Sequence, residues 1–259
     1  MKILLHSSKT MKAESTSAHQ LTTPRFITQA TYLNGLLASM TAEEVSQLMA
    51  ISEPLAKDVK ARIRDWTNSG DGTAAALTFR GDIYSGLSAG QWDTRAAAFA
   101  QEHLLILSGL YGVLRPFDAI KPYRLEMGYK LHTNEGVRLD TYWERQLVPA
   151  IDASDTYLNL TANEYFKTVK KQLSAARVIS PKFLTVSPKT GQPTFVTVHA
   201  KIARGSFANW LVTNQIDDPS QIIDYTDLNY HYDAASSTKS EPVFVCQEFG
   251  GLGLSVRLK

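Results

Sequence analysis

Residues Leu104–Gly128 read LLILSGLYGVLRPFDAIKPYRLEMG, and the organisation of the chain depends on how this segment folds. Upstream, Asp93 has the character of a helix N-cap, and the apolar positions that follow it predict a helix ending at Gly109. Pro116 prevents one long helix from continuing through the segment. The order apolar-Ser-Gly-apolar-x-Gly-apolar ahead of Arg115 therefore has the outline of a helix–hairpin–helix.

Two interpretations of this glycine-rich turn are open. In a helix–hairpin–helix, Gly109 and Gly112 would let the backbone approach a phosphate closely, and Arg115 with free N–H groups would hold the anion. Contacts of this kind position the protein on a nucleic-acid backbone and read little sequence. The alternative is an ordinary helix C-cap followed by a glycine turn, which binds nothing.

Strands and helices alternate on both sides of this segment. Lys2–His6 is a short apolar run that predicts a strand, Thr41 and Glu44 have capping-box spacing at a helix start, and Leu77–Leu87 predicts a strand followed by a tight loop. Other expected elements are helices at 53–66 and 200–215, a hairpin with strands at 183–186 and 194–198, and strands at 157–160, 242–247 and 254–258. This interleaving predicts an α/β (mixed α+β) fold, a single compact body forming one domain over residues 1–259 and containing the helix–hairpin–helix.

Charge is unevenly distributed along the 259 residues. The chain has 27 basic and 25 acidic residues, a net charge of +2. The stretch Tyr165–Ile216 contains no Asp or Glu but eight Lys or Arg residues, which leaves the rest with 19 basic and 25 acidic residues and a net charge of −6. Such asymmetry suggests an anionic partner if the eight cations share a face, and mere solvation if they scatter.

Several classes of protein are excluded or disfavoured. The only cysteine is Cys246, so no internal disulfide can form and a cytoplasmic location is expected. No segment has the length of a transmembrane helix and the start lacks the pattern of a secretory signal, so no membrane partner is expected. Phosphate-loop, dinucleotide, esterase-elbow and zincin motifs are absent, and we expect no cofactor and no metal site. An iron site assembled from distant carboxylates and histidines stays open as an alternative.

Three polar and aromatic clusters are candidates for chemistry. They are GDIYSGL with Asp82 and Tyr84, PYRLEMG with Arg124 and Glu126, and NLTANEYFKTVK after the expected strand at 157–160. Polar clusters at strand ends are where α/β proteins usually place their sites. Each cluster could equally be a buried hydrogen-bonded network that fixes loops.

Taken together, these segments resemble the YaaA family of peroxide stress proteins. The matching segments cover nearly the whole chain and are Lys9-Thr10, FRGDIYSGL at 79–87, LSGLYGVLRPFDAIKPYRLEMG at 107–128, NLTANEYFKTVK at 159–170 and AKIARG at 200–205. Two departures are visible: His6-Ser7-Ser8 stands where the family commonly has Ser-Pro-Ala, and Asp233–Ser240 matches the acidic, serine-rich tail segment only loosely.

The resemblance implies a cytoplasmic protein that limits unincorporated iron and its damage under hydrogen peroxide, with a family-specific fold, a helix–hairpin–helix and a basic DNA-binding cleft. On this basis we expect a monomer that binds double-stranded DNA without sequence preference. The expected nucleic-acid contacts are Ser108, Gly109, Gly112, Arg115, Lys121, Arg124, Lys167, Lys170, Lys171, Lys201 and Arg204.

Two alternatives to a non-catalytic DNA-binding protein stay open. The first is an enzyme acting on a nucleic acid or a small anionic metabolite, because the clusters contain residue types used for acid–base work and anion binding. Its candidate residues are Lys9, Asp82, Tyr84, Glu126, Tyr165 and Lys167. A converging polar pocket would favour the enzyme, and a broad open groove would favour the DNA-binding protein. The second alternative is direct iron binding.

Overall fold

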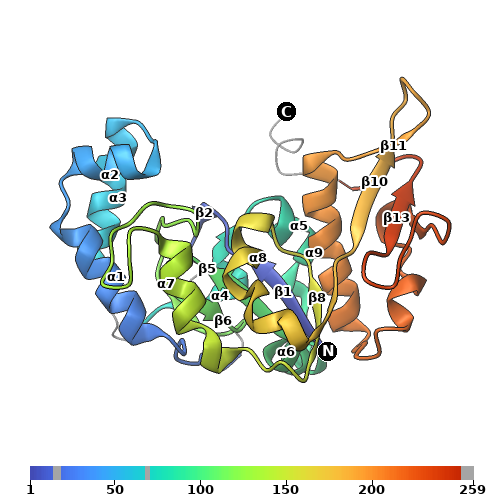
Figure 1. Ribbon diagram of the computed structural model, residues 1–259, viewed down its shortest axis with the longest axis horizontal. Coiled ribbons are helices and arrows are strands. Elements are labelled where there is room, and N and C mark those ends of the chain that lie inside the picture. The colour runs from blue at the N-terminus through green and yellow to red at the C-terminus, as the bar shows by residue number, and fades with distance from the viewer. Residues whose placement is uncertain (14–18, 68–70, 252–259) are drawn as a thin grey trace.

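A five-stranded sheet with β1 (Lys2–His6) in its middle organises the fold. The computed structural model describes residues 1–13, 19–67 and 71–251 and is shown in Figure 1. In the sheet order β6-β5-β1-β8-β9, the last four strands run parallel, and β6 is antiparallel to β5. The neighbours of β1 are β5 (Leu104–Ser108), β6 (Gly112–Leu114), β8 (Thr156–Asn159) and β9 (Arg177–Ile179).

Helices cover this sheet, because β1 is apolar on both faces. Ile3, Leu4 and Leu5 are all fully buried, as expected for a parallel strand with helices packed on either side. In Figure 1, α8 crosses in front of β1 and β8. The helices of this part of the chain are α4 (Ala75–Thr78), α5 (Asp82–Leu87), α6 (Thr94–His103), α7 (Leu139–Gln146), α8 (Asn163–Lys170) and α9 (Thr197–Thr213).

Three helices, α1 (Ile27–Ser39), α2 (Ala42–Met49) and α3 (Glu53–Asp65), form an arm at the left of Figure 1. The predicted capping box at the start of α2 is confirmed, since the Thr41 side chain accepts from the Glu44 amide and the Glu44 side chain accepts from the Thr41 amide. Lys60 caps the end of α1 by donating to the carbonyl oxygens of Leu37, Ala38 and the C-cap residue Met40. The arm is therefore held by local capping as well as by packing.

A second sheet lies beyond α9, which runs between the two sheets in Figure 1. Its order is β11-β10-β13-β12, with strands β10 (Lys182–Val186), β11 (Pro193–Thr194), β12 (Tyr230–Tyr232) and β13 (Val243–Cys246). Phe183 and Phe207 pack with their ring centroids 5.6 Å apart, and Phe207 also meets Tyr225 at 4.8 Å. This aromatic cluster fastens α9 to the second sheet.

The remaining elements are short. Two two-stranded ladders pair β2 (Thr10–Met11) with β4 (Phe79–Arg80) and β3 (Thr73–Ala74) with β7 (Ala119–Ile120). The 3-10 turns are η1 (Ala89–Gln91), η2 (Val148–Ala150), η3 (Gln172–Ala175), η4 (Gln221–Asp224) and η5 (Asp227–Asn229). Among the described residues, no helix is both long and apolar enough to cross a membrane.

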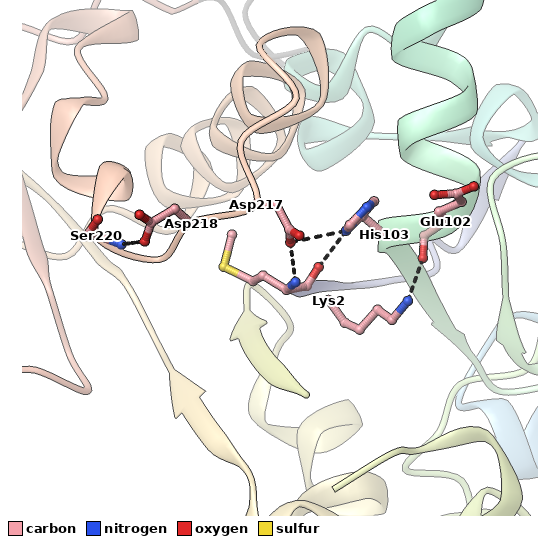
Figure 2. Close-up of polar contacts among 7 residues, drawn as sticks. Lys2, Glu102, His103, Asp217, Asp218 and Ser220 are labelled. Atoms are coloured by element: carbon pink, nitrogen blue, oxygen red, sulfur yellow. Dashed lines mark hydrogen bonds and ion pairs between the residues drawn. The ribbon is translucent and has the colours of Figure 1, made fainter. Parts of the chain in front are cut away.

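Polar contacts tie the start of β1 to its surroundings, as Figure 2 shows. The Met1 amino group donates to Asp217, and His103 Nδ1 lies 2.9 Å from the Met1 carbonyl oxygen and 3.5 Å from the Asp217 carboxylate. Lys2 Nζ donates to the Glu102 carbonyl oxygen at 2.9 Å. The end of α6 and the loop after α9 are thereby joined to the central strand.

The mixed α/β class and the single compact body are confirmed, but two local predictions are wrong. The helix expected to end at Gly109 ends at His103, and Leu104–Ser108 is the strand β5, which hydrogen-bonds to β1. Asp82–Leu87, expected as a loop, is the helix α5. The strand predicted at 254–258 lies outside the described residues.

The predicted helix–hairpin–helix at Leu104–Arg115 is also wrong. Strands β5 and β6 form an antiparallel β-hairpin in which Ser108 pairs with Gly112. The apolar run is a strand because β5 pairs with β1 from Ile3↔Leu104 onward and buries Leu104, Ile106 and Leu107 completely. Long-range pairing overrides the local helical spacing.

Candidate functional site

A cavity of about 360 Å³ opens at the carboxyl ends of β1 and β8. This edge is where ligands bind in open α/β sheets. Five segments that lie far apart in the sequence converge on it. The lining residues are His6, Ser7, Ser8, Lys9, Thr10, Arg80, Gly81, Asp82, Ile83, Tyr84, Glu126, Ala162, Glu164 and Lys201.

The loop after β1 is fixed at both ends. Ser7 N donates to the Leu107 carbonyl oxygen at 2.8 Å, which extends the pairing of β1 with β5 by one residue. Thr10 pairs with Arg80 in the β2–β4 ladder. The exposed side chain of Lys9 is therefore presented at the cavity by a loop with little freedom.

Glu126 is the titratable group best suited to proton transfer. Its side chain is almost buried, and its carboxylate lies 3.9 Å from Lys9 Nζ. Burial raises the pKa of Glu126, and the charge of Glu164 acts in the same direction against the opposing effect of Lys9. Raising the pKa of a carboxyl group moves its titration toward neutral pH, which is the direction that a general acid or base requires.

Buried hydroxyl groups lie next to Glu126 on the side away from the cavity. We call Ser7, Ser108, Tyr123 and Tyr165 the hydroxyl network. The Tyr165 hydroxyl hydrogen-bonds to Glu126 and lies 3.2 Å from Ser7 Oγ, while Ser108 Oγ lies 2.7 Å from the Tyr123 hydroxyl, which also bonds to Ser7. Burial raises the pKa of Tyr123 and Tyr165, so both remain protonated. The network holds the Glu126 side chain in one position.

His6 is a buried, neutral imidazole at the wall of the cavity. Its Nδ1 accepts a hydrogen bond from the Ala162 amide at 3.2 Å, and its ring packs against that of Tyr165 with centroids 4.9 Å apart. Burial lowers the pKa of His6 to about 3, with further lowering by the charges of Arg204 and Lys201. Because Nδ1 is the acceptor, the single proton of the neutral ring is on Nε2.

One cation on α9 lines this part of the cavity, and a second lies near His6 on the same helix. Lys201 lines the cavity, and Arg204, one helical turn later, is half-buried. Burial lowers the pKa of Arg204, and in the part of the chain that the structure describes Arg204 makes no ion pair with a carboxylate. No carboxylate of the described residues therefore pairs with this positive charge beside His6.

The candidate residues for an enzyme come together, with one exception. Lys9, Asp82, Tyr84 and Glu126 all line the cavity, and Tyr165 lies directly behind Glu126. Lys167 is exposed on α8 and is not part of the lining. The three polar clusters seen in the sequence are thus parts of one site and of the buried network beneath it.

Three of the residues expected to contact nucleic acid are instead packed inside the fold. Ser108 is fully buried, a Cβ on Gly109 would lie 2.1 Å from the Leu125 carbonyl oxygen, and one on Gly112 would lie 2.4 Å from the Trp143 ring. Gly112 also has a φ of +70°. Packing and turn geometry explain why this hairpin needs glycine.

The cations predicted to line a cleft lie on several different elements. Lys121 pairs with Asp71 at 2.9 Å, and Arg124 is half-buried beside Glu126. Lys167 and Lys170 are exposed on α8, with no ion pair to the described residues. Further pairs neutralise Arg115 with Asp118 at 3.3 Å, Lys171 with Glu144 at 3.4 Å and Lys182 with Glu241 at 3.0 Å.

Sequence reasoning missed His6, Ser7 and Ser8, although His6 ends the first strand and the two serines directly follow it. Their position at the end of a buried parallel strand was the available signal. The same three residues form the departure from the usual family pattern, so that departure lies in the cavity wall. Among the described residues, no three or more His, Cys, Asp or Glu side chains gather closely enough to hold a metal ion.

Comparison with known proteins finds a matching family and relatives that align with most of the chain. A family model described as peroxide stress protein YaaA matches residues 1–236. A UPF0246 protein of Salinispora tropica is 43% identical over 99% of this chain and 98% of its own length. UPF0246 proteins of Cupriavidus metallidurans and Ruegeria pomeroyi are 38% and 39% identical, covering 94% and 86% of this chain and 98% and 90% of their own lengths.

Proposed function

The chain belongs to the peroxide stress protein YaaA family, and from this premise we propose that it acts in the cytoplasm during peroxide stress as an enzyme on a small anionic substrate. The observation that carries the proposal is the cavity itself. It brings a carboxyl group of raised pKa, Glu126, together with the cations Lys9 and Lys201 in a space of about 360 Å³. A volume of this size suits a metabolite.

The reaction class that this arrangement supports is proton transfer. Lys9 and Lys201 attract the anionic substrate, and Glu126 takes a proton from it or gives one to it. Tyr165 holds the Glu126 carboxyl group in place by its hydrogen bond. Tyr84 fixes the end of β1, because its hydroxyl donates to the His6 carbonyl oxygen at 3.0 Å.

The test compares the wild type with Glu126→Gln, which keeps the size of the side chain and removes the titrating proton. Both proteins are incubated with small-molecule extracts of peroxide-treated cells, and the anionic species consumed are identified by mass spectrometry. A matched control is Glu43→Gln, an exposed position in the first turn of α2. We expect at least one species to be consumed by the wild type and the control but not by Glu126→Gln. Equal consumption by all three proteins, or none by any, would contradict the proposal.

Duplex DNA is the second candidate partner, and the α8 cations favour it. Lys167 and Lys170 are three residues apart on an exposed helix face. Counterion release would make affinity fall with salt by a slope of about −0.9 per phosphate contacted. We expect Lys167→Gln with Lys170→Gln to reduce that slope, whereas Lys189→Gln in the β10–β11 turn would not. Binding that stays constant between ~50 and ~200 mM salt would remove this candidate.

The physiological role proposed with either partner is protection from peroxide damage by limiting unincorporated iron. Cells that lack the protein should contain more unincorporated iron under peroxide, as measured by whole-cell electron paramagnetic resonance. The wild-type protein should restore the normal level. Restoration by Glu126→Gln but not by the α8 double variant would assign the role to DNA binding, and the opposite result would assign it to the cavity.

A further inference from the structure

His6 has a hydrogen-bond donor with no acceptor in the part of the chain that the structure describes. More than nine-tenths of the residue is buried, and its ring forms part of the cavity wall. Nδ1 is occupied by the Ala162 amide, so the proton is on Nε2. Among the described residues, no atom hydrogen-bonds to Nε2, and Nε2 is not one of the atoms sealed from solvent. The N–H group is therefore available to whatever occupies the cavity.

The charges around His6 indicate the kind of atom that this donor meets. Lys201 and Arg204 are close enough to lower the pKa of His6. Arg204 is half-buried without an ion pair to a described carboxylate. A partly desolvated cation that lacks a partner is unfavourable, and an anion beside it would remove that cost. The Nε2–H donor of His6 and the cations Lys201 and Arg204 would therefore all interact favourably with the same kind of ligand group, an oxyanion.

We propose that His6 and Lys201 form an oxyanion subsite in the cavity wall, with the charge of Arg204 behind it, where the neutral His6 ring donates from Nε2 to a phosphate group of the substrate. This inference rests on the proposed function and specifies its substrate class as a small phosphorylated metabolite. Because the ring is neutral, it offers one directed hydrogen bond and adds no charge. The substrate then bridges from the α9 cations to the carboxyl group of Glu126.

The neutral state of His6 is built into the fold. The Ala162 amide donates to Nδ1, so that nitrogen cannot carry a proton without losing the bond. The Tyr165 ring covers one side, and the Tyr84 hydroxyl holds the His6 backbone oxygen. The donor therefore keeps its direction whether or not ligand is bound.

The test uses inorganic phosphate as the probe at pH 7 and the full chain labelled with nitrogen-15 at histidine. In the free wild type, we expect NMR spectra to show His6 as the neutral form protonated at Nε2. Adding phosphate should shift the Nε2–H signal. His6→Asn keeps an acceptor for the Ala162 amide but loses the donor toward the cavity, and it should bind phosphate about ten-fold more weakly. His6→Gln, whose amide can reach the Nε2 position, should recover part of that loss.

Three variants separate this inference from the proposed enzyme. Lys201→Gln should weaken phosphate binding, and the exposed Lys189→Gln should leave it unchanged. Glu126→Gln should bind phosphate at least as well as the wild type even though it fails in the turnover assay. Phosphate binding that is equal in the wild type and His6→Asn, with both folded by circular dichroism, would overturn the subsite. A doubly protonated His6 ring at pH 7 would also overturn it. Neither result would decide whether Glu126 is catalytic.

Discussion

Gly205 packs so closely against Ile83 that a Cβ atom on the glycine would lie 1.8 Å from the Ile83 carbonyl oxygen. The contact is reciprocal along the same two helices, because a Cβ on Gly86 would lie 2.2 Å from the Ile202 carbonyl oxygen. Helices α5 and α9 therefore touch backbone to backbone. This contact places Tyr84, on α5, opposite Lys201, on α9, at the cavity.

Gly205→Ala should destabilise the protein by about 3 kcal/mol, because the added methyl group can fit only if α5 moves away from α9. Urea unfolding followed by circular dichroism measures the change. Gly35→Ala is the matched control, since Gly35 lies in α1 and a Cβ added there would have no atom within 4 Å. It should be neutral or slightly stabilising. Equal midpoints for the two variants would show that the close contact is absent in solution.

Gly109→Ala tests whether the glycine-rich hairpin is structural. The Gly109 carbonyl oxygen accepts from Trp143 Nε1 at 2.8 Å, and a Cβ would lie 2.1 Å from the Leu125 carbonyl oxygen. We expect a loss of about 2–3 kcal/mol in the free energy of unfolding. A residue that served only to approach a phosphate would instead show unchanged stability and weaker DNA binding. That outcome would restore the nucleic-acid interpretation of the hairpin.

Local patterns in the sequence predicted those elements whose cause is local. The Thr41 capping box and the apolar strand Lys2–His6 depend on residues a few positions apart, and both are present. Strand β5 could not be predicted in this way, because Leu104–Ser108 continues the apolar spacing of the helix before it. What makes it a strand is pairing with β1, about one hundred residues earlier in the chain.

In the candidate site, too, the residue types could be predicted from local sequence, but their arrangement could not. Asp82, Tyr84, Glu126 and Tyr165 were visible as polar clusters near expected strand ends, but only the strand order brings them to one cavity. The state of His6 depends on the Ala162 amide, which belongs to a segment 156 residues away. The sequence near His6 indicates its place at a strand end but not its partner or its protonation state.

The buried neutral His6 predicts a specific pH dependence of stability. Its pKa is about 3 in the folded protein and 6.5 in the unfolded chain, so the unfolded chain takes up the proton first as the pH falls. The contribution of His6 to stability is therefore complete above pH 6.5 and is lost as the pH falls toward 3. The limiting slope is about 1.4 kcal/mol per pH unit.

The measurement is the free energy of unfolding of the wild type and of His6→Asn between about pH 7 and about pH 5. Most of this range lies below the pKa of histidine in the unfolded chain, so the unfolded chain is protonated there. Lys201, Arg204, Tyr84 and Tyr165 face His6, and all four are present in both proteins. Glu126 is present in both proteins, so its titration cancels to first order. We expect the advantage of the wild type over the variant to shrink as the pH falls. An advantage that stays constant with pH would mean that His6 is not buried in a neutral form.

Tyr165→Phe should change the titration of Glu126 without changing the cavity lining. The lost hydroxyl donates to the Glu126 carboxylate and thereby lowers its pKa, against the larger effect of burial, which raises it. Removing the hydroxyl should raise the Glu126 pKa further, because the charged form loses a hydrogen bond. Carbon-13 NMR of the glutamate carboxyl groups follows this titration. Tyr157→Phe is the control, since its hydroxyl bonds to the Asp152 backbone. If the hydroxyl network holds Glu126, only Tyr165→Phe shifts the Glu126 titration, and the shift is toward higher pH. An unchanged or lower Glu126 pKa would show that Tyr165 does not bond to the charged carboxylate.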